Sequence, residues 1–122
     1  MKIVMVGAGY VGLVSGVCFS DFGHDVICVD KDPDKIMRLN RGEVPIFEPG
    51  LEVLMTKNIQ AGRLSFTVDL SSAIDGADAV FISVGTPTRR GEGHADLDYV
   101  FAAVEEIALA ARGYLVIVTK ST

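Results

Sequence analysis

Three glycines near the amino terminus, Gly7, Gly9 and Gly12, stand in the spacing Gly-x-Gly-x-x-Gly directly after a short apolar run. In a strand–turn–helix unit, the first glycine permits a tight turn, the second lets a diphosphate approach the backbone, and the third allows close packing of helix on strand. The first N–H groups of such a helix, here those of Tyr10 and Val11, have no partner within the helix and point toward an anion. The motif therefore predicts a diphosphate-binding turn.

Asp30 closes the next apolar run, where a carboxylate is expected to accept hydrogen bonds from a ribose diol. A 2′-phosphate would stand against this carboxylate, and two such charges about 4 Å apart repel by roughly 4 kcal/mol at an effective dielectric of about 20. With the glycines, Asp30 predicts NAD rather than NADP as the cofactor. Lys31 follows directly, but the alternation of side chains along a strand aims it elsewhere. Lys35, in the first turn of the next predicted helix, is either a solvated surface lysine or a second contact to the ribose.

Two further segments are candidates for the same crevice. Val84, Gly85, Thr86 and Pro87 follow the fourth apolar run, which is predicted to lie beside the first strand, so we expect this turn to contact the cofactor. Residues 48–51, Glu-Pro-Gly-Leu, are interpreted only as a helix start, with an acid near the helix N-terminus and a proline in the first turn.

The composition argues against several classes of function. The chain has 122 residues, 49% of them hydrophobic, and a net charge of −5, which predicts one domain over residues 1–122 with one core. An acidic chain without a basic cluster is not expected to bind nucleic acid or a membrane surface, and no apolar run approaches the roughly 20 residues of a membrane span. His24 and His94 stand too far apart for metal-ligand spacing, so no metal is expected. Cys18 and Cys28 fall in apolar segments and are expected to be reduced thiols of a cytoplasmic protein without a signal peptide.

Apolar runs and helical patterns alternate along the chain. The predicted strands are Lys2–Val6, Asp25–Asp30, Leu64–Val68, Ala79–Val84 and Tyr114–Thr119. The predicted helices are Tyr10–Phe22, Pro33–Arg41, Gly50–Ala61, Leu70–Ile74 and Leu97–Arg112. This alternation predicts an α/β fold of the Rossmann-like type, a doubly wound parallel sheet of about five strands in the order 3-2-1-4-5 with helices on both faces.

Residues at the ends and on the faces of these helices carry further signals. Asp32 before Pro33 predicts an N-cap, and Gly23 and Gly113 predict helix ends. The pattern of the last helix predicts an apolar face and an acidic outer face, the former comprising Val100, Val104, Ile107, Leu109 and Ala111 and the latter Glu105 and Glu106.

The chain resembles the UDP-glucose 6-dehydrogenase family, part of the UDP-glucose/GDP-mannose dehydrogenases. The segments that carry the resemblance are residues 7–13 (Gly-Ala-Gly-Tyr-Val-Gly-Leu), 23–26, 29–32, 45–51 (Pro-Ile-Phe-Glu-Pro-Gly-Leu), 84–88 (Val-Gly-Thr-Pro-Thr), 95–97 and 120–122 (Lys-Ser-Thr). The resemblance implies an NAD-dependent enzyme that oxidises UDP-glucose to UDP-glucuronate in two hydride transfers, and a homo-oligomer. It places Asp30 and Lys35 on the adenosine ribose, Thr86 against the cofactor, and Ser121 and Thr122 near the nicotinamide, where Thr122 supports a catalytic water.

The resemblance covers only the N-terminal, NAD-binding part of the family. The family's nucleophilic cysteine, its catalytic lysine and asparagine, and its UDP-binding domain have no counterpart among these residues. The chain is thus expected to be a truncated piece that is inactive alone, of marginal stability or prone to self-association. Two alternatives stay open: a fragment of a GDP-mannose or UDP-amino-sugar 6-dehydrogenase, and a non-catalytic NAD-sensing module.

Overall fold

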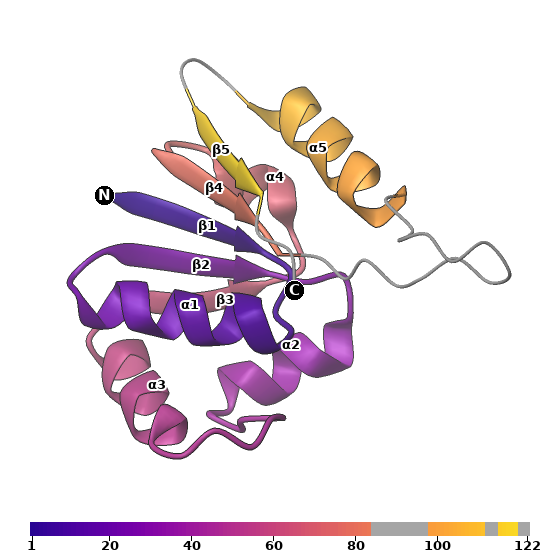
Figure 1. The fold of residues 1–122 in the computed structure, drawn as a ribbon. Coiled ribbons are helices and arrows are strands. Elements are labelled where there is room, and N and C mark those ends of the chain that lie inside the picture. Colours follow the sequence, from indigo (N-terminus) through magenta and orange to yellow (C-terminus); the bar gives the residue numbers. More distant parts are fainter. Residues whose placement is uncertain (84–97, 112–114, 120–122) are drawn as a thin grey trace, which may run out of the picture.

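The computed structural model describes residues 1–83, 98–111 and 115–119 of the chain. These residues form five strands and five helices in the predicted order, with two helices between β2 and β3 (Figure 1). In chain order they are β1 (Lys2–Val6), α1 (Tyr10–Asp21), β2 (Asp25–Val29), α2 (Pro33–Asn40), α3 (Leu51–Gln60), β3 (Leu64–Thr67), α4 (Leu70–Ile74), β4 (Ala79–Ile82), α5 (Asp98–Ala110) and β5 (Val116–Thr119).

All neighbouring strands of the sheet are parallel, in the order β3-β2-β1-β4-β5. The predicted Rossmann-like fold and strand order are therefore confirmed. On the central strand β1, Val4 lies between Ile27 of β2 and Val80 of β4 in the register of the sheet, and its side chain is fully buried. A strand covered on both faces needs apolar residues at successive positions, which explains why these strands are continuous apolar runs.

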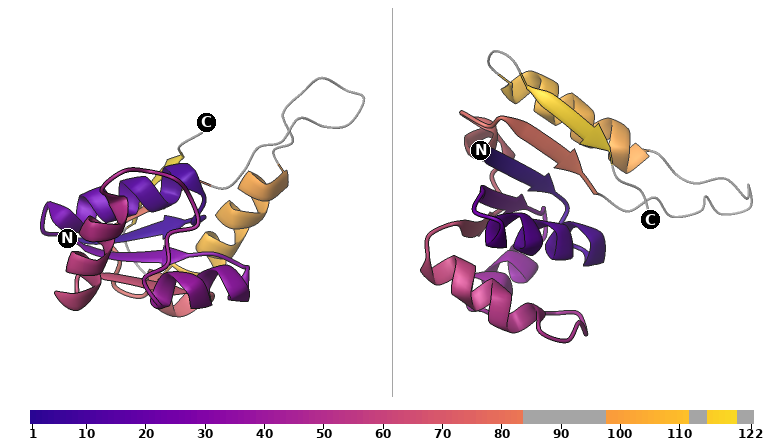
Figure 2. Two further views of the ribbon diagram at one scale, coloured as in Figure 1. Left: turned by 90° about the horizontal axis from the view of Figure 1, so that it is seen from below. Right: turned by 60° about the vertical axis from the view of Figure 1, so that its left-hand side comes forward.

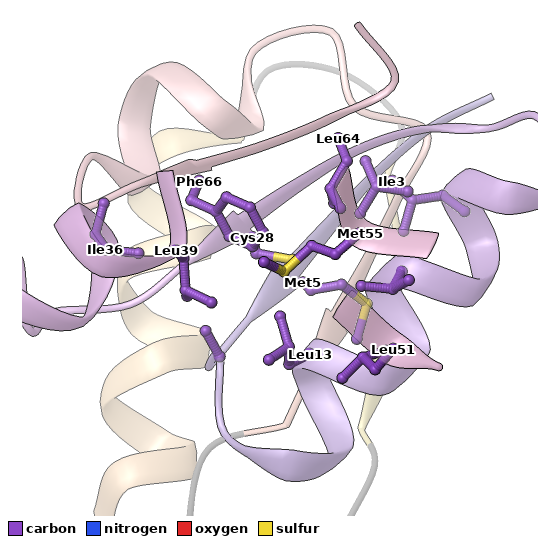
Figure 3. Packing of buried hydrophobic residues seen from close by; sticks show 13 residues of the cluster. Ile3, Met5, Leu13, Cys28, Ile36, Leu39, Leu51, Met55, Leu64 and Phe66 are labelled. Carbon is purple, nitrogen blue, oxygen red and sulfur yellow. The ribbon is translucent and has the colours of Figure 1, made fainter. Parts of the chain in front are cut away.

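Helices cover both faces of the sheet, and each face has its own core (Figures 1 and 2). Helices α1, α2 and α3 pack on one face, where Met5, Leu13, Leu39 and Met55 are fully buried (Figure 3). Helices α4 and α5 pack on the other face around Ile82 and other apolar side chains. The carboxyl ends of the strands and the start of α1 consequently meet at one edge of the sheet, as in other doubly wound folds (Figure 1).

The predicted end signals hold where the structure describes them. The carboxylate of Asp32 accepts hydrogen bonds from the N–H groups of Asp34 and Lys35 at 3.0 and 3.3 Å, and Pro33 begins α2. Gly23 follows the end of α1 with a φ of +106°, a conformation that favours glycine. Gly113 lies outside the described residues.

The predicted apolar face of α5 is partly wrong. Ile107 is buried, but Val104 is 38% exposed and Leu109 is 85% exposed. The helix instead packs through Ala103 and Ile107, which stand one turn apart on the same side, whereas Leu109 lies two positions from Ile107 and so points away. Ala111 is half-buried, and the side chain of Val100 is outside the described part. No helix among the described residues is long and apolar enough to cross a membrane.

Candidate dinucleotide-binding site

The turn between β1 and α1 has the geometry that its three glycines predict. Gly7 adopts a φ of +100°, and its N–H donates to the carbonyl oxygen of Val29 at 2.7 Å. A Cβ atom on Gly12 would lie 1.9 Å from the carbonyl oxygen of Gly7 and 2.5 Å from Oγ of Ser83. Only glycine fits at position 12, because helix and strand approach too closely for any side chain.

The N-terminus of α1 is suited to an anion. Gly9 is the N-cap residue, and no side chain of the described residues caps the helix or places an acid in its first turn. A Cβ atom on Gly9 would meet no described heavy atom within 4 Å. The N–H groups of Tyr10 and Val11 precede the first intrahelical hydrogen bonds and need an outside acceptor. A diphosphate fits this open, uncapped end.

Asp30 lies just beyond β2 and is held firmly in place. Its Oδ2 accepts a hydrogen bond from the N–H of Ala8 at 2.9 Å, and its Oδ1 accepts one from the N–H of Asp32 at 3.1 Å. Burial raises the pKa of Asp30, but these two bonds and the ammonium group of Lys35 outweigh burial, so the net pKa is lower than usual. The carboxylate is therefore ionised at neutral pH and oriented toward the end of the glycine turn.

The two lysines near Asp30 take different partners. Nζ of Lys35 lies 3.3 Å from Oδ2 of Asp30, so Lys35 does reach back to the predicted ribose site. Lys31, which the alternation of a strand aimed elsewhere, lines the same pocket as Asp30, and its Nζ lies 2.5 Å from Oε1 of Glu106 on α5. The strand ends at Val29, so the alternation does not extend to Lys31.

These residues surround a pocket of about 370 Å³ at the carboxyl ends of β1, β2 and β4. Its lining includes Gly7, Gly9 and Asp30 on one side and Ala102, Ala103 and Glu106 of α5 on another; the remaining lining residues are Val6, Val29, Lys31, Lys35, Val68, Leu70 and Ser83. Apolar side chains dominate this set, and the charged groups all belong to Asp30, its two lysine neighbours and Glu106. Such a pocket can hold a flat apolar base beside a polar ribose.

The roles of two residues, Glu48 and Ser83, were not predicted from the sequence. The hydroxyl of Tyr10 donates to Oε2 of Glu48 at 2.5 Å, which joins the start of α1 to the segment before α3. The predicted helix start is confirmed, because α3 begins at Leu51 with Gly50 as its N-cap, but Pro49 precedes the N-cap and does not lie in the first turn as predicted. Because Tyr10 and Glu48 lie far apart in the sequence, no local pattern predicts the hydrogen bond between them.

Ser83 is the second residue that the sequence did not predict at the site. It lies directly after β4, and its Oγ donates toward the carbonyl oxygens of Val6 and Gly7 at 3.2 and 3.1 Å.

The other candidate residues divide into two groups. Val84, Gly85, Thr86, Pro87, Ser121, Thr122 and His94 lie outside the described residues. Cys28 is fully buried in the core between the sheet and helices α1, α2 and α3, and Cys18 is half-buried, both as free thiols. Among the described residues, no three His, Cys, Asp or Glu side chains gather into a group able to hold a metal ion.

Comparison with known proteins identifies the family of this chain. The model of the UDP-glucose/GDP-mannose dehydrogenase family, NAD binding domain, matches residues 1–122. The chain belongs to this family. This NAD-binding domain is 65% identical over 122 residues to a UDP-glucose 6-dehydrogenase of Rhizobium meliloti, and 51% identical over 121 residues to the UDP-glucose 6-dehydrogenase TuaD of Bacillus subtilis. These alignments cover 100% and 99% of this chain but only 28% and 26% of the two relatives.

Solved structures agree with the sequence relatives. The domain superposes on a GDP-mannose dehydrogenase from Pseudomonas aeruginosa, crystallised as a ternary complex, with a TM-score of 0.94 and 43% identity. It superposes on a UDP-glucose dehydrogenase from Pyrobaculum islandicum with a TM-score of 0.92 and 40% identity. The first match covers 100% of this chain and 28% of the other, and the second covers 99% and 28%. NAD is therefore the cofactor that this domain binds.

Proposed function

We propose that residues 1–122 act as the NAD-binding domain of a UDP-glucose 6-dehydrogenase, which oxidises UDP-glucose to UDP-glucuronate with two molecules of NAD. The observation that carries this proposal is 65% identity, over the whole chain, to a relative named for that activity. Because the chain spans 28% of that relative's length, the activity belongs to a larger protein than the residues described here.

The residues of the site have distinct tasks in this proposal. Gly9 and the N–H groups of Tyr10 and Val11 hold the diphosphate, and Gly7 and Gly12 shape the turn that presents them. Asp30 binds the adenosine ribose. Bound NAD supplies the hydride acceptor, while the protein fixes its position and orientation.

Two further groups complete the proposed site. Lys35 supports Asp30, since its ammonium group lies against the same carboxylate. The segments outside the described residues keep their proposed roles from the family resemblance. Val84, Gly85, Thr86 and Pro87 contact the cofactor, Ser121 and Thr122 lie near the nicotinamide, and Thr122 supports a catalytic water.

A second candidate is the oxidation of GDP-mannose. It is favoured by the TM-score of 0.94 with a GDP-mannose dehydrogenase, although the identity to that protein is 43%. The NAD-binding residues do not separate the two reactions, because the sugar nucleotide lies beyond the adenosine site. The proposal further includes a homo-oligomeric enzyme and a cytoplasmic location, which the two free thiols fit.

The test is NADH formation by the complete protein that contains this chain, with UDP-glucose, GDP-mannose and UDP-N-acetylmannosamine supplied separately. The proposal predicts NADH formation with UDP-glucose, two molecules for each sugar oxidised, and far less with the other sugars. Replacement of NAD by NADP, the cofactor control, should reduce the rate. Turnover of GDP-mannose in preference to UDP-glucose would support the second candidate, and no NADH with any sugar nucleotide would contradict both.

A further inference from the structure

The pocket beside Asp30 contains four ionised side chains that form two pairs. Asp30 pairs with Lys35 at 3.3 Å, and Glu106 pairs with Lys31 at 2.5 Å. All four residues line the same pocket. The two carboxylates balance the two ammonium groups, so each cation among the described lining residues has a carboxylate partner.

Lys31 is placed where it can act as a phosphate ligand. It follows Asp30 directly, and consecutive Cα atoms are about 3.8 Å apart, so its long side chain reaches the space next to the Asp30 carboxylate. The Lys31 side chain is 76% exposed, and its ion-pair partner among the described residues is Glu106 of α5, whose side chain is 41% exposed. A lysine ammonium with a phosphate within reach is a strong electrostatic partner for it.

We propose that Glu106 is a specificity-determining residue, which holds Lys31 away from the ribose and so helps the domain to reject the 2′-phosphate of NADP. This inference rests on the proposed binding of the adenosine ribose at Asp30. Asp30 repels a 2′-phosphate directly, whereas Glu106 acts by occupying the cation that would otherwise attract it. The rejection of NADP thus depends in part on Glu106, a residue of α5 that lies far from the glycine motif in the sequence.

The expected effect is modest, because ion pairs between exposed side chains are weak and screened by salt. Glu106→Gln removes a carboxylate and frees an ammonium group in the same step. We expect the ratio of the dissociation constants for NADPH and NADH to fall by about three- to tenfold at low salt. The change should shrink as the ionic strength rises.

The experiment measures this ratio by fluorescence titration of the complete protein and four variants: Glu106→Gln, Glu105→Gln, Lys31→Ala and the double variant Lys31→Ala/Glu106→Gln. Glu105 is the matched control, since it is the preceding residue of α5, is exposed and does not line the pocket. The proposal predicts a lower ratio for Glu106→Gln, an unchanged ratio for Glu105→Gln, and no further change when Glu106→Gln is added to Lys31→Ala.

Three results would overturn the inference. They are an unchanged ratio in Glu106→Gln, an equal fall in Glu105→Gln, and an equal fall from Glu106→Gln with or without Lys31. The last result would mean that Glu106 acts through its own charge alone. Failure of the proposed NAD site is recognised separately, because the unmodified protein would then not bind NADH at all, whereas failure of the proposed sugar oxidation alone would leave NADH binding intact.

Discussion

Gly12 of α1 approaches the backbone of Gly7 so closely that a Cβ atom at position 12 would lie 1.9 Å from the Gly7 carbonyl oxygen. The same atom would lie 2.5 Å from Oγ of Ser83. The contact fixes the start of the helix over the end of the strand, and with it the N–H groups that we propose bind the diphosphate.

Substitutions at Gly12 and Gly9 should therefore have different effects, the first on stability and the second on NADH affinity. Gly12→Ala overpacks a backbone contact and should lower the free energy of unfolding by about 1–3 kcal/mol or more. Gly9→Ala meets no described atom within 4 Å and has an ordinary φ of −77°, so stability should change little. Its methyl group would stand where the diphosphate approaches, and NADH affinity should fall at least about tenfold. Chemical denaturation and NADH titration of both variants test this contrast, and equal stability of the two would contradict the proposed packing role of Gly12.

The hydrogen bond from Tyr10 to Glu48 predicts a shift in the titration of this tyrosine. The bond to Glu48 and the negative charge of Glu48 together raise the pKa of Tyr10 above its usual value. Glu48→Gln removes the charge, so the pKa of Tyr10 should fall. The difference in phenolate absorbance between Glu48→Gln and its parent, with Tyr10→Phe used to identify the signal, measures this shift. A titration that is the same in Glu48→Gln and the parent would show that the bond does not form in solution.

The sequence predicted the strand order and the turn because both depend on local patterns. Continuous apolar runs fix buried parallel strands, and the spacing of Gly7, Gly9 and Gly12 fixes the turn. Element ends moved by only one or two residues, as for the strand expected at Asp25–Asp30 and found at Asp25–Val29.

What the sequence could not predict depends on contacts between distant segments. The pairs Tyr10–Glu48 and Lys31–Glu106 each join a helix residue to a residue of a distant connecting segment, and no periodic pattern predicts such contacts. The exposure of the Leu109 side chain to solvent was not predicted, for a related reason. Several residues of α5 are apolar, and only packing against the sheet decides which of them are buried.

The buried thiol of Cys28 should resist modification in the folded protein. Burial raises its pKa to about 12, against about 8.5 for an unperturbed thiol. The folded state thus retains a proton that the unfolded chain loses above about pH 8.5, so this thiol makes the protein less stable as the pH rises through that range. At pH 8 an alkylating reagent should modify Cys18 before Cys28, as read by mass spectrometry of the peptides. Cys28 labelled as fast as Cys18 under native conditions would contradict its burial.

We propose that the carboxylate of Asp30 binds the ribose of NAD in the pocket beside the glycine turn. Calorimetric titration of the complete protein with NADH and NADPH, repeated with Asp30→Ala, tests it most directly. Hydrogen bonds to a charged group contribute about 1.5–3 kcal/mol each, so Asp30→Ala should weaken NADH binding at least about tenfold and narrow the preference for NADH over NADPH. If Asp30→Ala folds normally and binds NADH as tightly as the unmodified protein, the ribose does not lie at Asp30 and the assignment of the site is wrong.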